Sequence, residues 1–266
     1  LKPFLGRTLQ VAVDSRLGPR PREVMADLSL EGFNALLHKA EGRDKLARFF
    51  QYSARAFVGA CAVAAPTAGT ALSKTEGHAR TAMVSLAGAR RTHRWCKEIP
   101  VLQSIPKCLA IKNPVDRALD FLQKASLATF MIIDHVGHLK QWKILPGGKR
   151  AGAGTIQLGL KFFCFSNFVG AVSQLKKFLA LAASQEDRRK EEVACLKTAF
   201  KHLLLVVQTA HLSMLYQSHD LLVGVAGMIT SSMDLQLQWP AAKLASPRVA
   251  TTEAVSVNAR GETKSS

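Results

Sequence analysis

The chain has 266 residues, enough for one or two domains with a hydrophobic core. Apolar residues make up 48% of it, and 36 Lys and Arg against 19 Asp and Glu give a net charge of +17, which favours a polyanionic partner. The five cysteines form no C-x-x-C pair, so their spacing indicates neither a zinc site nor a disulfide framework.

Residues 1–27 are basic and rich in Pro and Gly, and we expect a disordered extension there, with a transit peptide as the alternative. Two helices are predicted next, within residues 28–60. Apolar side chains such as Leu36 and Phe49 recur there at helical spacing, while cations such as Arg48 occupy the other side. These helices are therefore expected to be amphipathic and basic.

Residues 56–73 carry no charge, but Ala, Gly and Thr dominate them and Pro66 interrupts any straight helix. Small side chains gain little free energy on transfer into a bilayer. We therefore predict a flexible or re-entrant segment, with a poor transmembrane span as the alternative.

An amphipathic helix is predicted over residues 80–99, and it should end there because Pro100 disfavours the helical conformation in the residue before it. At about 100° per residue, apolar and basic side chains fall on two different faces. The apolar face holds Val84, Trp95 and Ile99, and the basic face holds Arg90, Arg91, Arg94 and Lys97. This division is typical of a helix in a membrane interface, with the apolar side chains inserted and the cations on lipid phosphates. The alternative is a surface helix that packs its apolar stripe on its own protein.

The central helix is predicted over residues 115–142 and carries Asp134, His135 and His138. The two histidines lie three residues apart and could share a metal ion. Because no second cluster supplies further ligands, we expect no metal site.

Two later segments, 155–175 and 203–233, are candidate hydrophobic membrane segments. Asp220 lies inside the second, which is consistent either with two helices meeting there or with one span that has a polar edge. Acidic residues within apolar runs can line a pore, but placement at a membrane edge or a helix end is the simpler interpretation. Residues 241–266 are polar and rich in Ser and Thr, which predicts a disordered tail.

Helical periodicity without strand-like alternation predicts an all-α, membrane-associated protein with one helical domain over residues 28–240, amphipathic helices and two to three weak hydrophobic membrane segments. The basic residues mostly flank apolar segments, which favours anionic lipids over nucleic acid as partners. A soluble nucleic-acid binder is the alternative. Neither a G-x-S-x-G motif nor a Cys with an evident His partner is present, so we predict no catalytic residues, no cofactor and no enzyme activity.

The motif Glu41-Gly-Arg-Asp-Lys-Leu46, followed by Phe50-Gln-Tyr-Ser-Ala-Arg55, closely resembles the opening motif of the peroxin-11 family. The residues that carry this resemblance are Gly42, Arg43, Asp44, Lys45, Gln51, Tyr52 and Arg55. Weaker similarity continues in the same order through residues 85–95, 114–119, 133–136 and 224–240.

The resemblance implies a peroxisomal membrane protein that elongates the organelle before division, self-associates, and recruits a fission adaptor and a dynamin-related GTPase. It also implies that residues 84–99 form the membrane-remodelling helix. We therefore predict that the chain bends the membrane by shallow insertion of this helix. The alternative is a pore or transport protein for small solutes, with Asp134, Lys161 and Asp220 inside the membrane.

Overall fold

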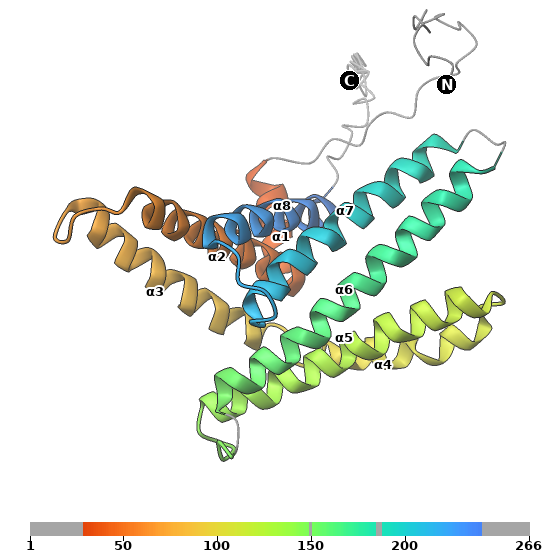
Figure 1. Cartoon of the computed structure of the whole chain (residues 1–266), viewed down its shortest axis with the longest axis horizontal. Helices are drawn as coiled ribbons and strands as arrows, with labels where there is room; N and C mark the ends of the chain where they lie inside the picture. The colour runs from red at the N-terminus through yellow and green to blue at the C-terminus, as the bar shows by residue number, and fades with distance from the viewer. Residues whose placement is uncertain (1–28, 149–150, 185–187, 241–266) are drawn as a thin grey trace, which may run out of the picture.

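A computed structural model describes residues 29–148, 151–184 and 188–240, and all regular structure within these ranges is helical (Figure 1). The predicted all-α, membrane-associated class is confirmed. The extensions predicted at 1–27 and 241–266 lie outside the described residues. The helices are α1 (Leu30–His38), α2 (Ala40–Ala64), α3 (Ala71–Thr92), α4 (Glu98–Ser104), the 3-10 helix η1 (Pro106–Ala110), α5 (Pro114–Gln141), α6 (Gly152–Ala182), α7 (Arg189–Leu212) and α8 (Asp220–Gln238).

Local sequence determines where several helices begin. At the start of α3, the backbone N–H of Ser73 donates to the Thr70 hydroxyl at 3.3 Å. Asn113 caps α5, whose first residue is Pro114, a position where no backbone N–H is needed. The helix expected over residues 115–142 thus corresponds to α5.

The first difference from the predicted boundaries concerns the segment 56–73, which was expected to be flexible. Its first nine residues continue α2, which ends where Ala65 adopts a left-handed backbone with φ of 43°. Because Pro66 follows directly, the helix cannot continue. The break predicted from Pro66 is therefore present, but it is short.

The second difference concerns the helix expected over residues 80–99. It corresponds to α3, which begins earlier and ends at Thr92. A turn over residues 93–97 follows, with Cys96 at φ of 63°, and Ile99 then lies in α4. Pro100 occupies the first turn of α4, where its missing N–H costs no helical hydrogen bond, so it does not end a helix there.

The main helix contacts are α5 with α6, α6 with α7, α2 with α8 and α2 with α3 (Figure 1). The α2 and α8 backbones approach closely because glycines lie between them. A Cβ on Gly224 would be 2.3 Å from the backbone nitrogen of Ala56, and one on Gly227 would be 2.1 Å from the ring of Tyr52. Only a residue without a side chain permits this approach.

The first half of α2 directs polar side chains inward, whereas its second half buries apolar ones such as Val58 and Cys61. Asp44, Arg48 and Gln51 are buried, whereas Phe50 is 54% exposed. On the facing helices, Gln208 and Thr230 are also buried. The interior between α2, α7 and α8 is therefore largely polar, and its buried charges require partners.

Helices α6 and α7 are long and apolar enough to cross a membrane. Their most apolar windows are only 44% and 22% buried, respectively, whereas the core helix of a soluble protein would be mostly buried. Exposed apolar side chains recur at helical spacing along both helices: Phe162, Phe165, Phe168, Val172, Leu175 and Leu179 on α6, and Val193, Leu196, Phe200, Leu203 and Val207 on α7. These stripes are suited to contact with lipid tails.

The segment expected over residues 203–233 contains two helices, one of the two arrangements that its sequence allows. Helix α7 ends at Leu212, and α8 begins at Asp220. The carboxylate of Asp220 therefore lies in the first turn of a helix, where the helix dipole favours negative charge.

Candidate functional site

The motif residues of α2 form contacts that connect several helices. Asp44 and Gln51 face α3, and Tyr52 packs beneath Gly227 of α8. Arg55 forms an ion pair with Asp220, at the start of α8, with an Nη1–Oδ1 distance of 2.5 Å. The family motif thus lies at the centre of the polar packing, and Gly42 and Arg43 attach the first turns of α2 to α1 through Leu36 and Leu37, respectively.

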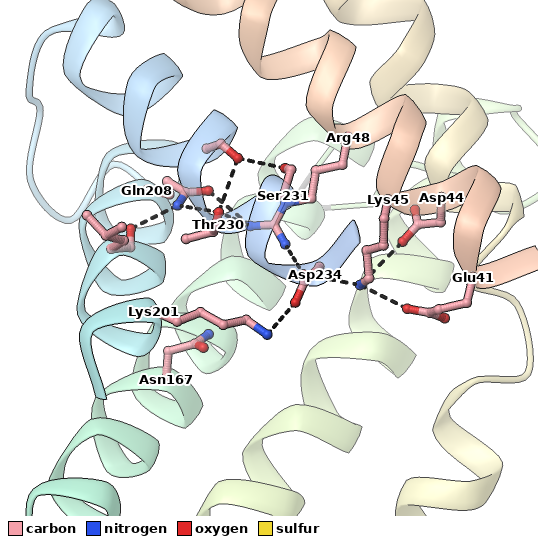
Figure 2. Close-up of polar contacts among 12 residues, drawn as sticks. Glu41, Asp44, Lys45, Arg48, Asn167, Lys201, Gln208, Thr230, Ser231 and Asp234 are labelled. Carbon is pink, nitrogen blue, oxygen red and sulfur yellow. Dashed lines mark hydrogen bonds and ion pairs between the residues drawn. The ribbon is translucent and has the colours of Figure 1, made fainter. Parts of the chain in front are cut away.

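Three cations converge on the carboxylate of Asp234 in α8 (Figure 2). Arg48 Nη1 lies 3.1 Å and Lys45 Nζ 3.6 Å from Asp234 Oδ2, and Lys201 of α7 contacts the other oxygen. Arg48 also donates to the side chains of Gln208 and Thr230, on α7 and α8. One buried carboxylate therefore joins three helices.

The cations predicted to bind lipid phosphates are instead paired with carboxylates of the same chain. Arg90 donates to Asp44 at 3.2 Å and to Gln51 at 2.6 Å. Arg91 and Arg94 lie 3.6 and 3.4 Å from the buried carboxylate of Asp134, and Lys97 pairs with Glu41. These four cationic side chains are only 12–27% exposed.

Arg90, Arg91, Arg94 and Lys97 therefore do not lie open on the surface in this conformation, and their binding to lipid phosphates stays a prediction. The physical reason is that carboxylates on α2 and α5 can form charge-assisted hydrogen bonds with the cations of this helix face, just as lipid phosphates can. In this conformation the basic face of α3 and of the following turn points toward the rest of the protein.

The ion pairs between α2 and α3 are ionised at neutral pH. Burial alone would raise the pKa of Asp44, but the positive charges of Arg90 and Lys45 outweigh burial and hold that pKa below its ordinary value. Burial also opposes ionisation of Glu41, but Lys97 and Lys45 lower its pKa. For the cation, burial and the nearby Arg94 lower the pKa of Arg90 to about 10, against the effect of Asp44. The stability that the two carboxylates contribute is lost only as the pH falls through their lowered pKa values.

The three residues predicted to insert into the membrane are exposed, but they do not share one helix. Val84 on α3 is 66% exposed, and Ile99 on α4 is 49% exposed. Trp95 lies in the turn between them and is 41% exposed, with its ring 6.1 Å from that of Trp142 on α5. The structure thus replaces the predicted continuous stripe by apolar side chains on a helix–turn–helix segment.

Helix α3 packs on α2 without burying an apolar face. It has 22 residues, and none of them is fully buried. Its contacts with the remaining chain rest on ion pairs and half-buried side chains rather than on an apolar core. Most helices gain their stability from packing an apolar face, so α3 lacks the usual apolar attachment.

The three charged residues of the pore alternative have different surroundings. Asp134 is buried and paired with Arg91 and Arg94, and Asp220 pairs with Arg55. Lys161 is exposed on α6. The two histidines of α5 also have separate surroundings, since His135 faces Glu98 and His138 packs on Trp142.

Sequence reasoning missed Asp234 and Lys201 as members of the polar network and placed Arg48 on a basic outer face. One signal was available, because Asp234 is an acid at the end of an otherwise uncharged run, 221–233. A lone acid in such a run is either exposed at a helix end or paired with a cation. Periodicity alone does not identify which cation, and Arg48 is 186 residues away.

Comparison with known proteins identifies a family for this chain. The model of the family "Peroxisomal biogenesis factor 11" matches residues 30–239, a range that includes all the helices described above. No curated protein and no solved structure matches the chain. The matched family is a group of biogenesis factors and not a known enzyme family. The chain therefore belongs to the peroxisomal biogenesis factor 11 family and is a protein of the peroxisomal membrane with a role in peroxisome proliferation and division.

Proposed function

We propose that the chain elongates the peroxisomal membrane by shallow insertion of exposed apolar side chains on α3, the following turn and α4. The observation that carries this proposal is that α3 has no fully buried residue and exposes Val84 to 66%. A helix attached mainly through charges can keep its apolar side chains available for lipid.

The physical basis is the difference in area between the two leaflets. Val84, Trp95 and Ile99 would enter the boundary between head groups and acyl chains, to a depth of about 5–10 Å. Inserted volume expands one leaflet relative to the other, and the membrane relieves this difference by curving. The apolar stripes of α6 and α7 support the proposal, since helices in the bilayer would hold the inserting segment close to its target.

The cations have a second part in this proposal. While Arg90, Arg91, Arg94 and Lys97 pair with carboxylates, they fix the orientation of α3. Lipid phosphates then compete with Asp44 and Asp134 for these side chains. Each cation near an anionic surface gains about 1 kcal/mol, which offsets part of the cost of leaving these carboxylates.

Self-association belongs to the same proposal. The exposed stripes on α6 and α7 offer area for a second copy as well as for lipid. A cluster of inserting segments would bend the membrane more than isolated ones. We further propose that a fission adaptor and a dynamin-related GTPase act on the elongated membrane.

The test uses the full chain reconstituted with anionic liposomes. Val84→Glu and Ile99→Glu change exposed positions, so the fold should remain intact. Each should weaken membrane insertion at least about tenfold, because burial of an aliphatic side chain contributes about 1.5–3 kcal/mol, and each should reduce tubulation seen by electron microscopy. The control is Thr75→Glu, which is exposed and lies about 180° from Val84 around α3.

Thr75→Glu should tubulate liposomes like the natural sequence. Full tubulation by Val84→Glu and Ile99→Glu would contradict the proposal. Equal loss in all three variants would also contradict it, because added negative charge alone would then explain the result.

A further inference from the structure

One cavity among the described residues lies inside the polar network and has a volume of about 450 Å³. Five helices line it: α2, α3, α5, α6 and α7. Small-molecule sites in proteins commonly measure about 300–1,000 Å³. The cavity is therefore large enough for a ligand, although not for a whole two-chain lipid.

The polar wall of this cavity has an excess of positive charge. Seven cations line it: Lys45, Arg48, Arg55, Arg90, Arg91, Arg94 and Lys97. Three carboxylates, those of Glu41, Asp44 and Asp134, line it with them. Asp220 and Asp234 pair with some of these cations from outside the lining, so five carboxylates in all face seven cations. An excess of buried positive charge is unfavourable without an anion.

Two arginines in the wall have hydrogen-bond donors to spare. The Nε atoms of Arg55 and Arg91 are buried, and neither has a hydrogen-bond partner among the described residues. The carboxylate nearest to Arg91 Nε is that of Asp134, at 3.6 Å, beyond the usual hydrogen-bond length. A compact acceptor with several oxygens, such as a phosphate, would satisfy such donors.

A second part of the lining, on α5, α6 and α7, is apolar and lies among polar residues such as Gln157 and Gln208. Leu127 and Met131 of α5, Leu160 of α6, and Leu205 and Leu212 of α7 contribute to it. Two of these three helices, α6 and α7, are the candidate membrane spans. This apolar part of the lining therefore belongs largely to the part of the protein that is suited to contact lipid tails.

We propose that this cavity binds the phosphate head group of an anionic lipid. The arginines of α2 and α3 contact the phosphate, and the part of the acyl chain nearest the head group lies along the apolar side chains of α5, α6 and α7. Free inorganic phosphate could contact the same arginines, but it has no acyl chain to contact the apolar side chains. The proposal does not depend on insertion of Val84, Trp95 or Ile99, because those side chains do not line the cavity.

The experiment uses the full chain, purified in a neutral detergent, and native mass spectrometry to count bound ligand. The probes are oleoyl lysophosphatidic acid, oleoyl lysophosphatidylcholine and inorganic phosphate. We expect one lysophosphatidic acid per chain, at concentrations at which the other two probes bind at least about tenfold more weakly. Equal affinity for inorganic phosphate would overturn the proposal in favour of a free phosphate site. Equal affinity for lysophosphatidylcholine would overturn it in favour of general adsorption of amphiphiles.

Two variants locate the bound lipid. Arg91→Gln should weaken lysophosphatidic acid binding about tenfold, because a charge-assisted hydrogen bond to phosphate is lost. The matched control is Arg80→Gln on the same helix, since Arg80 pairs with Glu76 outside the cavity and its loss should leave binding unchanged. Equal weakening by both variants would indicate adsorption to the surface of α3 and would overturn the proposal.

A third variant covers the case in which Arg91→Gln disturbs the fold. Leu127→Trp keeps every charge and fills apolar space in the cavity, so it should block the lipid while circular dichroism stays unchanged. Full binding by Leu127→Trp would overturn the proposal. Val84→Glu should bind lysophosphatidic acid normally, so failure of the cavity proposal and failure of membrane insertion give different results.

Discussion

At the scale of single residues, Asp234 has the largest number of charged partners in the polar network. Its side chain is only 9% exposed, and Lys45, Arg48 and Lys201 contact it from two other helices. Burial alone would raise the pKa of Asp234, but these cations outweigh burial and lower it. The carboxylate is therefore ionised at neutral pH, and its charge compensates cations that have little access to water.

We expect Asp234→Asn to lower the free energy of unfolding by about 3–5 kcal/mol, because the substitution keeps the shape of the side chain and leaves buried cations uncompensated. The control is Asp116→Asn. Asp116 pairs with Lys176 where both side chains are more than a third exposed, so its loss should cost at most about 1 kcal/mol. Denaturant titration of the full chain in detergent measures both values. Similar values for the two variants would show that the Asp234 cluster adds no more stability than a surface pair.

At the scale of helices, the contact between α2 and α8 depends on the absence of side chains at two glycines. Gly224 lies against the backbone of Ala56, and Gly227 lies against the ring of Tyr52. This close approach brings the motif residues of α2 within reach of Asp234. Gly88 on α3 is a useful contrast, since a Cβ there would meet nothing within 4 Å.

The same substitution should therefore have opposite effects at two sites. Gly224→Ala should destabilise the fold by about 1–3 kcal/mol, because the added Cβ forces α2 and α8 apart. Gly88→Ala should stabilise it by about 0.5–1 kcal/mol, because alanine favours the helical conformation and nothing obstructs its methyl group. Thermal unfolding, followed by circular dichroism, measures the sign of each effect. A stabilising Gly224→Ala would contradict the described approach of the two helices.

Helices were largely predictable from the sequence because their periodicity is local, as the correspondence of α5 with residues 115–142 illustrates. The direction in which a helix faces was not predictable. Periodicity separated Arg90 and Arg91 from Val84 correctly, but it carries no information about which face meets the protein. Asp44, the partner of Arg90, is 46 residues away, and only the tertiary arrangement brings them together. The end of α3 at Thr92 was missed because the helix was expected to continue to Pro100. Pro100 instead lies in the first turn of a separate helix, α4, where proline is tolerated.

At the scale of the whole molecule, the buried side chains include many polar and charged groups beside apolar ones, and apolar stripes lie outside. Charged and amide groups fill the space between α2, α3, α7 and α8, while α6 and α7 expose aromatic and aliphatic side chains along their length. This distribution suits a protein whose surroundings are partly lipid, because lipid tails can contact the exposed apolar side chains. Because α6 and α7 are consecutive and pack together, the side of the membrane on which their connecting segment lies can be tested.

If both α6 and α7 cross the bilayer, the segment that connects them lies on one side of it. The start of α6 and the end of α7 then both lie on the other side. The test introduces Ser184→Cys or Gln217→Cys into a chain whose five native cysteines are replaced by serine. We expect a membrane-impermeant maleimide, added to intact peroxisomes, to label only one of these two positions. Both positions should be labelled after permeabilisation. Labelling of both from one side would show that the two helices do not each cross the bilayer.

The long separation between Arg48 and Asp234, 186 residues, has a consequence for how the protein is made. Translation produces the arginine early and its carboxylate partner only near the end of the chain. Until the last helix leaves the ribosome, Arg48 and Arg55 of α2 lack the carboxylates of α8 with which they pair. Chains that stop before α8 should therefore be less stable than the complete chain, because these arginines remain without counter-ions.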